Sequence, residues 1–103
     1  MIVKDKIKRE ELQIPFTKAA VDIEKETISL GCELHIDCVD ELIKNGSAPK
    51  DIWGFNIYPD GRLDFVSLIN IRPADENRSM EIKNQEIRQK IEKIIKELMA
   101  NDQ

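Results

Sequence analysis

The chain has 103 residues, of which 16 are Lys or Arg and 20 are Asp or Glu, so its formal net charge is −4. This length predicts a single domain over 1–103 with one hydrophobic core. The acidic balance argues against nucleic acid as a partner, because affinity for duplex DNA comes from cationic side chains that meet phosphates. No apolar run approaches the roughly 20 residues of a membrane span, which argues against a membrane partner.

The first twelve residues, MIVKDKIKREEL, are charged throughout, so no secretory signal is expected. Two cysteines are too few for a disulfide scaffold, and the expected location is therefore the reducing cytoplasm. Residues 1–7 alternate loosely between apolar and charged side chains, which predicts an edge strand whose lysines hinder pairing with another sheet.

Residues 16–30 place apolar side chains at the spacing of one helix face, which predicts a helix. Pro15 fits its first turn, where the missing N–H costs nothing, and Gly31 fits the position after its end. Residues 32–37 (CELHID) alternate with period two and predict a strand. If this strand is parallel to the one at 1–7, the helix between them is a right-handed crossover.

Asp37 is expected to cap a short helix that runs through Asn45 and ends at Gly46. The next two segments, 52–58 and 62–72, are rich in strand-forming residues. They flank a Pro-Asp-Gly turn, and this arrangement predicts a β-hairpin.

A final helix is expected after an irregular loop over 74–83, and Asn84 is suited to cap it. The apolar residues of this helix form the stripe of one face: Ile87, Ile91, Ile94, Ile95, Leu98 and Met99. The order β-α-β-α-β-β-α predicts an α+β two-layer sandwich. Its sheet would be small and mixed, with the hairpin at 52–72 and the helices on one face.

Three titratable residues are candidate catalytic groups because they interrupt these patterns. Glu24 falls within the apolar sector of the predicted helix over 16–30, where a carboxylate needs a partner or has a raised pKa. Alternatively, the helix is slightly rotated and Glu24 lies at a wet boundary. His35 is the only histidine, and Asp37 on the same strand face could orient its ring. The alternatives are a surface or satisfied core histidine, and a plain helix cap at Asp37.

Cys32, His35 and Cys38 resemble a metal-binding triad in the linear sequence. On the predicted strand, however, both cysteines face away from His35, whereas a tetrahedral zinc needs converging ligands. We therefore predict no metal site, and expect both cysteines to fill the core. No motif identifies a cofactor: a glycine-rich phosphate loop, a Gly-x-Ser-x-Gly elbow and a His-Glu-x-x-His helix are all absent from the sequence.

Two residues interrupt the predicted hairpin strands. Gly54 inside a strand indicates close approach by another backbone or by a ligand. Asn70 is disfavoured in a strand, which indicates a specific hydrogen bond. A buried amide that ties a strand to a loop and a ligand contact are both open explanations.

The candidate ligand-binding residues are Asn56, Arg72, Asn77 and Arg78. Asn56 lies in the first hairpin strand, Arg72 ends the second, and the other two lie in the long loop that follows. Two guanidinium groups with amide donors can clamp a carboxylate or a phosphate. The competing explanation is that both arginines pair with carboxylates of the same chain.

Several phrases, taken together, resemble a small uncharacterised prokaryotic family classed as a domain of unknown function. They are VDIEKE (21–26), ELHID (33–37), GS (46–47), DIWGFNIYP (51–59), SLINIRP (67–73), NRS (77–79) and EIRQKI (86–91). The resemblance covers nearly the whole chain and implies that the candidate residues and Trp53 belong to one shared pattern. The family carries a Gln soon after the GS pair, whereas Ala48, Pro49 and Lys50 stand there in this chain. The resemblance implies no activity.

The leading hypothesis is a polar pocket at one sheet edge that binds a small anionic ligand. Glu24, His35 and Asp37 would supply acid/base or metal-binding groups, as in a hydrolase, and Arg72 and Arg78 would bind the anion. A shared site requires the side chains of Glu24, His35 and Arg72 to lie within about 12 Å on one surface. The alternative is a non-catalytic interaction module that forms a homodimer through the terminal helix and the first strand.

Overall fold

Four antiparallel strands form a sheet in the order β2-β1-β3-β4. The computed structural model describes residues 1–99. In chain order its strands and α-helices are β1 (Thr17–Asp22), β2 (Thr27–Leu30), α1 (His35–Lys44), β3 (Ile52–Ile57), β4 (Leu63–Asp64) and α2 (Gln85–Leu98). The α+β class is confirmed, whereas the mixed sheet is wrong because every strand pair is antiparallel.

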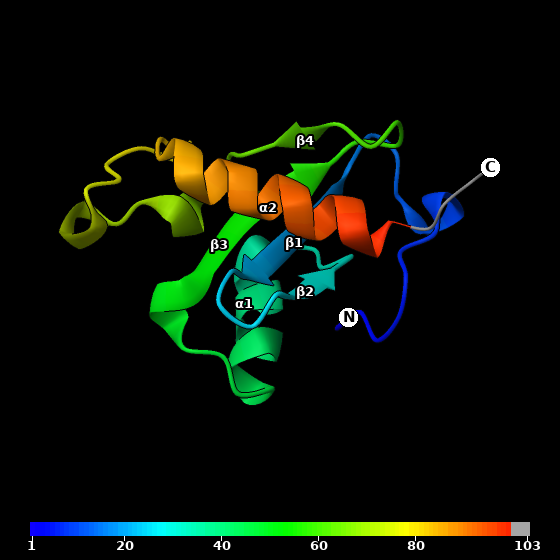
Figure 1. The fold of residues 1–103 in the computed structure, drawn as a ribbon, viewed down its shortest axis with the longest axis horizontal. Helices are drawn as coiled ribbons and strands as arrows, with labels where there is room; N and C mark the ends of the chain where they lie inside the picture. Colours follow the sequence, from blue (N-terminus) through cyan, green and yellow to red (C-terminus); the bar gives the residue numbers. More distant parts are fainter. Residues whose placement is uncertain (100–103) are drawn as a thin grey trace.

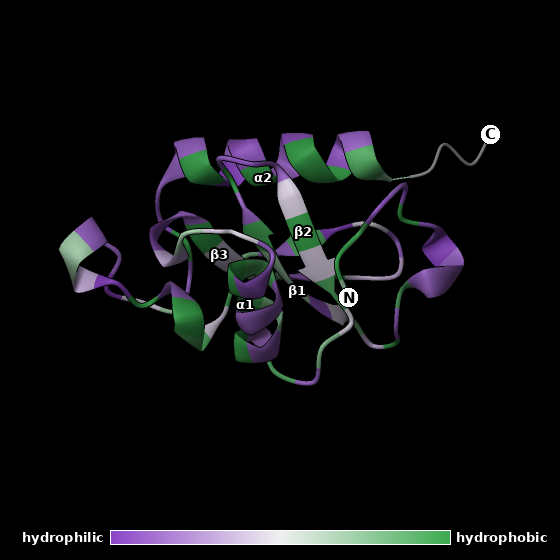
Figure 2. Ribbon diagram, turned by 90° about the horizontal axis from the view of Figure 1, so that it is seen from below, coloured by the Kyte–Doolittle hydropathy of each residue, from purple (hydrophilic) through white to green (hydrophobic). Residues whose placement is uncertain are grey.

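The two helices cover opposite faces of the sheet (Figures 1 and 2). Alternation along β1 explains this: Ala19 and Val21 pack into the core beneath α2, while Ala20 packs against α1. The prediction that the helices share one face is therefore wrong, and the molecule has three layers. Among the described residues, neither helix is both long and apolar enough to span a membrane.

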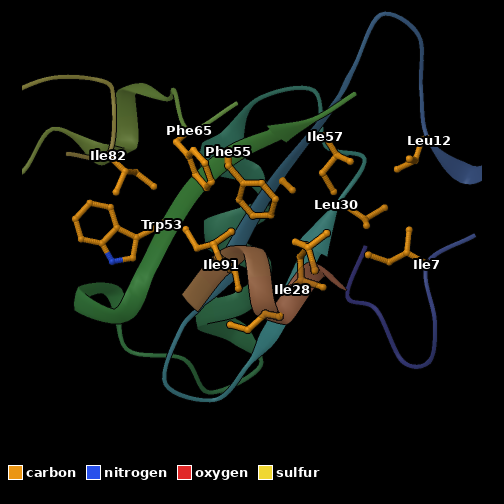
Figure 3. Packing of buried hydrophobic residues seen from close by; sticks show 14 residues of the cluster. Ile7, Leu12, Ile28, Leu30, Trp53, Phe55, Ile57, Phe65, Ile82 and Ile91 are labelled. Carbon is orange, nitrogen blue, oxygen red and sulfur yellow. The ribbon is translucent and has the colours of Figure 1, made fainter. Parts of the chain in front are cut away.

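The larger core lies between the sheet and α2 (Figure 3). Trp53, Phe55 and Ile57 project from one face of β3, as their alternation predicts, and meet the isoleucine stripe of α2. The Asn84 side chain caps this helix by accepting hydrogen bonds from the N–H groups of Glu86 and Ile87. The predicted terminal helix and its cap are both confirmed.

The segment predicted as a helix over 16–30 is the β1–β2 hairpin, so that prediction is wrong. Its turn forms because Asp22 Oδ1 accepts hydrogen bonds from the backbone N–H groups of Glu24 and Lys25. Glu26 completes the turn with a left-handed backbone, φ 56°. β-Branched residues on both sides of the turn then favour strand pairing over a helix.

The predicted strand over 32–37 is also wrong, because α1 begins at His35. Asp37 is the third residue of the helix rather than its cap, and its carboxylate accepts a hydrogen bond from the Leu34 N–H. Cys32 and Cys38 form a disulfide across this helix start. They are therefore neither simple core filler nor free thiols.

The N-terminal residues cover the open edge of β2. Ile2 forms an isolated antiparallel bridge with Ser29, and the Val3 N–H donates to the Ile28 carbonyl. Residues 1–7 form no regular strand beyond such bridges. One side of this N-terminal segment is thus paired with β2 of the same chain.

The second strand of the predicted hairpin is much shorter than expected. β4 spans Leu63–Asp64, and the chain then forms a 3-10 turn over Leu68–Asn70. In place of a longer strand, the buried Asn70 carboxamide pairs with the backbone of Gly54. This contact requires glycine, because a Cβ on Gly54 would lie 2.8 Å from side-chain atoms of Ile69 and Ser67.

Candidate functional site

Two adjoining hollows lie beside the start of α1, and together we call them the groove. The first, of about 370 Å³, is lined by Phe16, Lys18, Leu34, His35, Ile36, Asn56, Val66, Ser67, Leu68, Ile69 and Met80. The second, of about 400 Å³, is lined by Ile36, Val39, Pro49, Lys50, Ile69, Arg72 and Asp75. Ile36 and Ile69 belong to both hollows, so the two lie side by side on the surface.

The groove concentrates apolar side chains that are open to solvent. Leu34, Ile36, Leu68 and Met80 are 58%, 48%, 71% and 40% exposed, and all four line the first hollow. In a chain that is 35% charged, such a gathering on one surface indicates a binding site rather than an incidental surface residue. The pocket predicted as polar is therefore mainly apolar in its walls.

His35 contributes the main titratable group of the first hollow. Its Nε2 lies 3.0 Å from the Phe55 carbonyl oxygen and 2.8 Å from Asn56 Oδ1. Both neighbours are acceptors, so Nε2 carries the proton and donates. In the neutral ring Nδ1 is then the unprotonated nitrogen, and it makes no hydrogen bond to any residue within 1–99. A ligand N–H or O–H can donate to this atom.

Burial lowers the pKa of His35 below its usual value, because the charged ring would lose hydration. The positive charge of Lys18 lowers this pKa further, while the Phe55 carbonyl, Asn56 and Asp64 oppose the shift. The imidazole is consequently neutral at pH 7 and presents a lone pair rather than a positive charge.

Asn56 holds the ring in this state. Its Nδ2 donates to Asp64 Oδ2 at 3.3 Å and to the Val66 carbonyl at 3.4 Å, which orients the amide oxygen toward His35. Asp64, Asn56 and His35 thus form a chain of hydrogen bonds from β4 through β3 to α1. Asn56 is 6% exposed and lines the first hollow, and its amide is engaged in these contacts within the protein.

Arg72 supplies the cation of the second hollow. Its guanidinium lies 4.2 Å from the centre of the Trp53 ring and donates to the Lys50 and Ile69 carbonyl oxygens. These bonds use two of its five N–H groups. No carboxylate of the described residues lies within 4.0 Å of it. Burial lowers the pKa of Arg72, although the charges of Asp75 and Asp51 raise it.

Glu24 and Asp37 lie outside the groove lining. Glu24 is exposed in the β1–β2 turn, 3.8 Å from the Lys90 ammonium of α2, which covers the opposite face from α1. Its expected place on an apolar helix face disappears with the helix. Asp37 follows His35 by two residues, but its carboxylate stabilises the start of α1 instead of orienting the ring.

Asn77 and Arg78 are also absent from the groove lining. The buried Asn77 amide donates to three backbone carbonyls and accepts from the Lys83 N–H, so its capacity is used in closing the loop. Arg78 is exposed. Of the seven predicted site residues, His35 and Asn56 line the first hollow and Arg72 lines the second.

Sequence reasoning missed Asp64, Lys18 and the apolar walls of the groove. Asp64 pairs with Asn56 across the β3–β4 hairpin. This pairing could have been inferred from the sequence, because the Pro-Asp-Gly turn fixes the register of the two strands. The exposed apolar residues carry no comparable local signal. Within residues 1–99, no group of three or more His, Cys, Asp or Glu side chains is placed to hold a metal ion.

Comparison with known proteins gives one match. The sequence model of a family described as "Protein of unknown function (DUF5674)" matches residues 1–98. No curated protein and no solved structure matches the chain.

Proposed function

The chain belongs to the DUF5674 family of proteins of unknown function, and we propose a function from the geometry of its own residues: the groove binds a small organic anion. The ligand would carry a carboxylate on an aliphatic body. Arg72 would bind the carboxylate, the exposed apolar residues would cover the body, and His35 Nδ1 would accept a hydrogen bond from a polar substituent.

The observation that carries this proposal is the guanidinium of Arg72. It is half-buried, so it has lost part of its hydration, yet no carboxylate of residues 1–99 is close enough to form an ion pair with it. Stacking on Trp53 fixes the plane of the guanidinium. Three N–H donors remain, and a fixed planar group with adjacent donors suits a two-point contact with a carboxylate.

The walls of the groove select the remainder of the ligand. Leu34, Leu68 and Met80 present hydrocarbon and thioether surface to solvent, and covering apolar area contributes roughly 25 cal/mol per Å². A phosphate or another compact inorganic anion would gain nothing from these walls. An aliphatic carboxylate uses both the walls and Arg72.

A second candidate function, acid/base catalysis, is favoured by the hydrogen-bond chain that ends at His35. Its neutral Nδ1 could take a proton from a water or hydroxyl group of the ligand, while Nε2–H stays bonded to the Phe55 and Asn56 oxygens. Asp64 would stabilise the resulting imidazolium only through the Asn56 amide. Recognition therefore fits the arrangement better than hydrolysis.

The proposal is tested by titrating the protein with octanoate and following its side-chain and backbone NMR signals. We expect saturable shifts at Arg72 Nε–H, at the His35 ring and at the methyl groups of Leu34 and Met80. Arg72→Gln should weaken octanoate at least about tenfold, because a charge-assisted hydrogen bond is lost. The matched control is Arg78→Gln, which removes an exposed arginine outside the groove and should leave the affinity unchanged.

Octanol measures the apolar contribution alone and should bind more weakly than octanoate. Equal affinity of octanol and octanoate, or an unchanged octanoate affinity in Arg72→Gln, would show that the groove does not recognise an anion.

A further inference from the structure

We propose that Cys32 and Cys38 form a thiol–disulfide exchange site that takes a dithiol reductant, and that its state sets the shape of the groove. This inference rests on the proposed function, because it assigns a regulation to the same site. No comparison and no motif in the sequence assigns a redox role to these cysteines.

The disulfide encloses the part of the chain that forms the groove wall. The cysteines are six positions apart with their Cα atoms separated by 5.8 Å, and Leu34, His35 and Ile36 lie between them. All three of these residues line the first hollow. Any change in the freedom of this short loop therefore acts directly on the groove.

The two sulfur atoms differ in their surroundings. Cys38 is completely buried in the smaller core, among Ala20, Leu42 and Ile52. Cys32 is only partly buried, at the edge of that core. The disulfide thus fastens a surface segment to the buried core, and Cys32 is the sulfur that a reductant can reach.

Other contacts of this segment with the sheet are few and lie near its N-terminal end. The Gly31 N–H donates to the Lys18 carbonyl, and the exposed Lys18 ammonium donates to the Glu33 carbonyl at 2.7 Å. Leu34 and Ile36 are about half-exposed, so packing adds little restraint. His35 begins α1, and Leu34 is tied to Asp37 in the first turn of that helix. Besides the disulfide, the hydrogen bonds of the His35 ring tie this helix start directly to β3.

Reduction proceeds through a mixed disulfide between Cys32 and the reductant. A thiolate of the reductant attacks Cys32 Sγ, which forms a mixed disulfide and breaks the bond to Cys38, whose sulfur leaves with the electron pair and takes a proton. The second thiol of the reductant then attacks the reductant sulfur that is bonded to Cys32. This closes the reductant's disulfide and releases Cys32, which also takes a proton. Two electrons and two protons pass to the protein, and the reductant becomes a disulfide.

After reduction, the Cys32 side of the loop is no longer bonded to the core. Both thiols can donate to the Lys18 carbonyl, which lies 3.8 Å from Cys32 Sγ and 4.0 Å from Cys38 Sγ. A thiol donor is weak, so this contact restrains the loop less than a covalent bond. His35 then spends time away from Asn56, and the groove loses the fixed position of its titratable group.

The test compares the native protein before and after treatment with dithiothreitol, without denaturant. We expect complete reduction, amide hydrogen exchange at 35–39 at least about tenfold faster, and unchanged exchange in α2. The His35 ring should titrate closer to its ordinary pKa in the reduced protein. The variant Cys32→Ser/Cys38→Ser should behave like reduced protein and should not respond to dithiothreitol.

Octanoate affinity separates this inference from the proposed function. We expect octanoate to bind the reduced protein at least about fivefold more weakly, because a mobile wall must be ordered on binding. A disulfide that resists dithiothreitol in the folded protein, or equal exchange and equal octanoate affinity in both states, would overturn the switch. Absence of octanoate binding in both states would overturn the proposed function, and the exchange and titration data would still decide whether the loop responds to reduction.

Discussion

The substitution Asn70→Ala tests how the shortened sheet is completed next to the groove. β3 pairs with β4 at two positions, Asn56 with Asp64 and Ile57 with Leu63. Beyond them no strand within residues 1–99 pairs with the outer side of β3, and the Asn70 carboxamide takes that place. It accepts from the Gly54 N–H at 2.8 Å and donates to the Gly54 carbonyl at 2.9 Å.

The magnitude follows from the groups that the substitution leaves without partners. Asn70 and Gly54 are both buried, so water does not readily replace the lost amide. Leaving a buried backbone donor or acceptor unpaired costs about 1–3 kcal/mol, and Asn70→Ala leaves one of each. The third contact, to the Met80 carbonyl at 3.1 Å, lies nearer the surface and adds less. We expect a loss of about 3 kcal/mol in the free energy of unfolding.

Urea denaturation followed by circular dichroism measures this loss, with an unchanged m-value as the sign that both states keep their exposed area. In thermal unfolding the same change lowers Tm by roughly 15 °C for a domain of this size. The control is Leu68→Ala in the same 3-10 turn, where the side chain is 71% exposed and the expected change is within about 0.5 kcal/mol. A loss below about 1 kcal/mol in Asn70→Ala would refute the view that this amide substitutes for a strand.

Gly54→Ala should destabilise the protein by about 1–3 kcal/mol in urea denaturation, because the new Cβ would lie 2.8 Å from Ile69 and Ser67; an unchanged midpoint would contradict the close approach. His35 has a folded-state pKa below its unfolded value, so the unfolded chain binds the extra proton first. The contribution of neutral His35 to the free energy of unfolding is complete above about pH 6.5, the unfolded-state pKa. It is lost as the pH falls from there through the folded-state pKa. His35→Gln should therefore show a weaker loss of stability than the wild type between pH 7.5 and pH 5, and parallel curves would contradict the shift.

The sequence predicts correctly those elements whose apolar residues repeat with a single spacing, either that of a strand or that of a helix. Trp53, Phe55 and Ile57 alternate strictly on β3 and enter the same core. The isoleucines of α2 keep helical spacing over its length, and Asn84 marks the start of the helix. In both cases the local pattern and the buried face agree, so no knowledge of tertiary contacts was needed.

The hairpin of β1 and β2 could not be predicted, because the spacing of its apolar residues fits both the period of a helix and the period of a strand. Both strands are almost wholly buried, so apolar residues occur in runs that also match a helix face. The deciding signal is the Asp22 turn, whose carboxylate accepts two successive backbone N–H groups. Missing this turn placed Glu24 on an apolar helix face, although its side chain is exposed at the tip of a hairpin.

The candidate site was predicted in part, for a related reason. His35 and Arg72 carry chemistry that is visible in a sequence, and the fold brings both to the groove. The apolar walls are not visible in this way, because the exposure of Leu34, Leu68 or Met80 depends on which segments leave them uncovered. Asn77 shows the converse: its polar character suggested a ligand, but backbone carbonyls of its own loop use its donors.

The charge of the site distinguishes binding from proton transfer. A general base of the Ser-His-Asp type has a carboxylate directly on the ring nitrogen opposite the reacting one, which stabilises the imidazolium as it forms. In this protein the corresponding atom, His35 Nε2, meets two neutral oxygens, and the Asp64 carboxylate is one amide further away. Burial and Lys18 also lower the pKa of the ring. The Phe55, Asn56 and Asp64 oxygens favour the cation, but burial and Lys18 outweigh them, so the ring stays neutral. A neutral imidazole suits a hydrogen-bond acceptor for a ligand better than it suits a catalytic base.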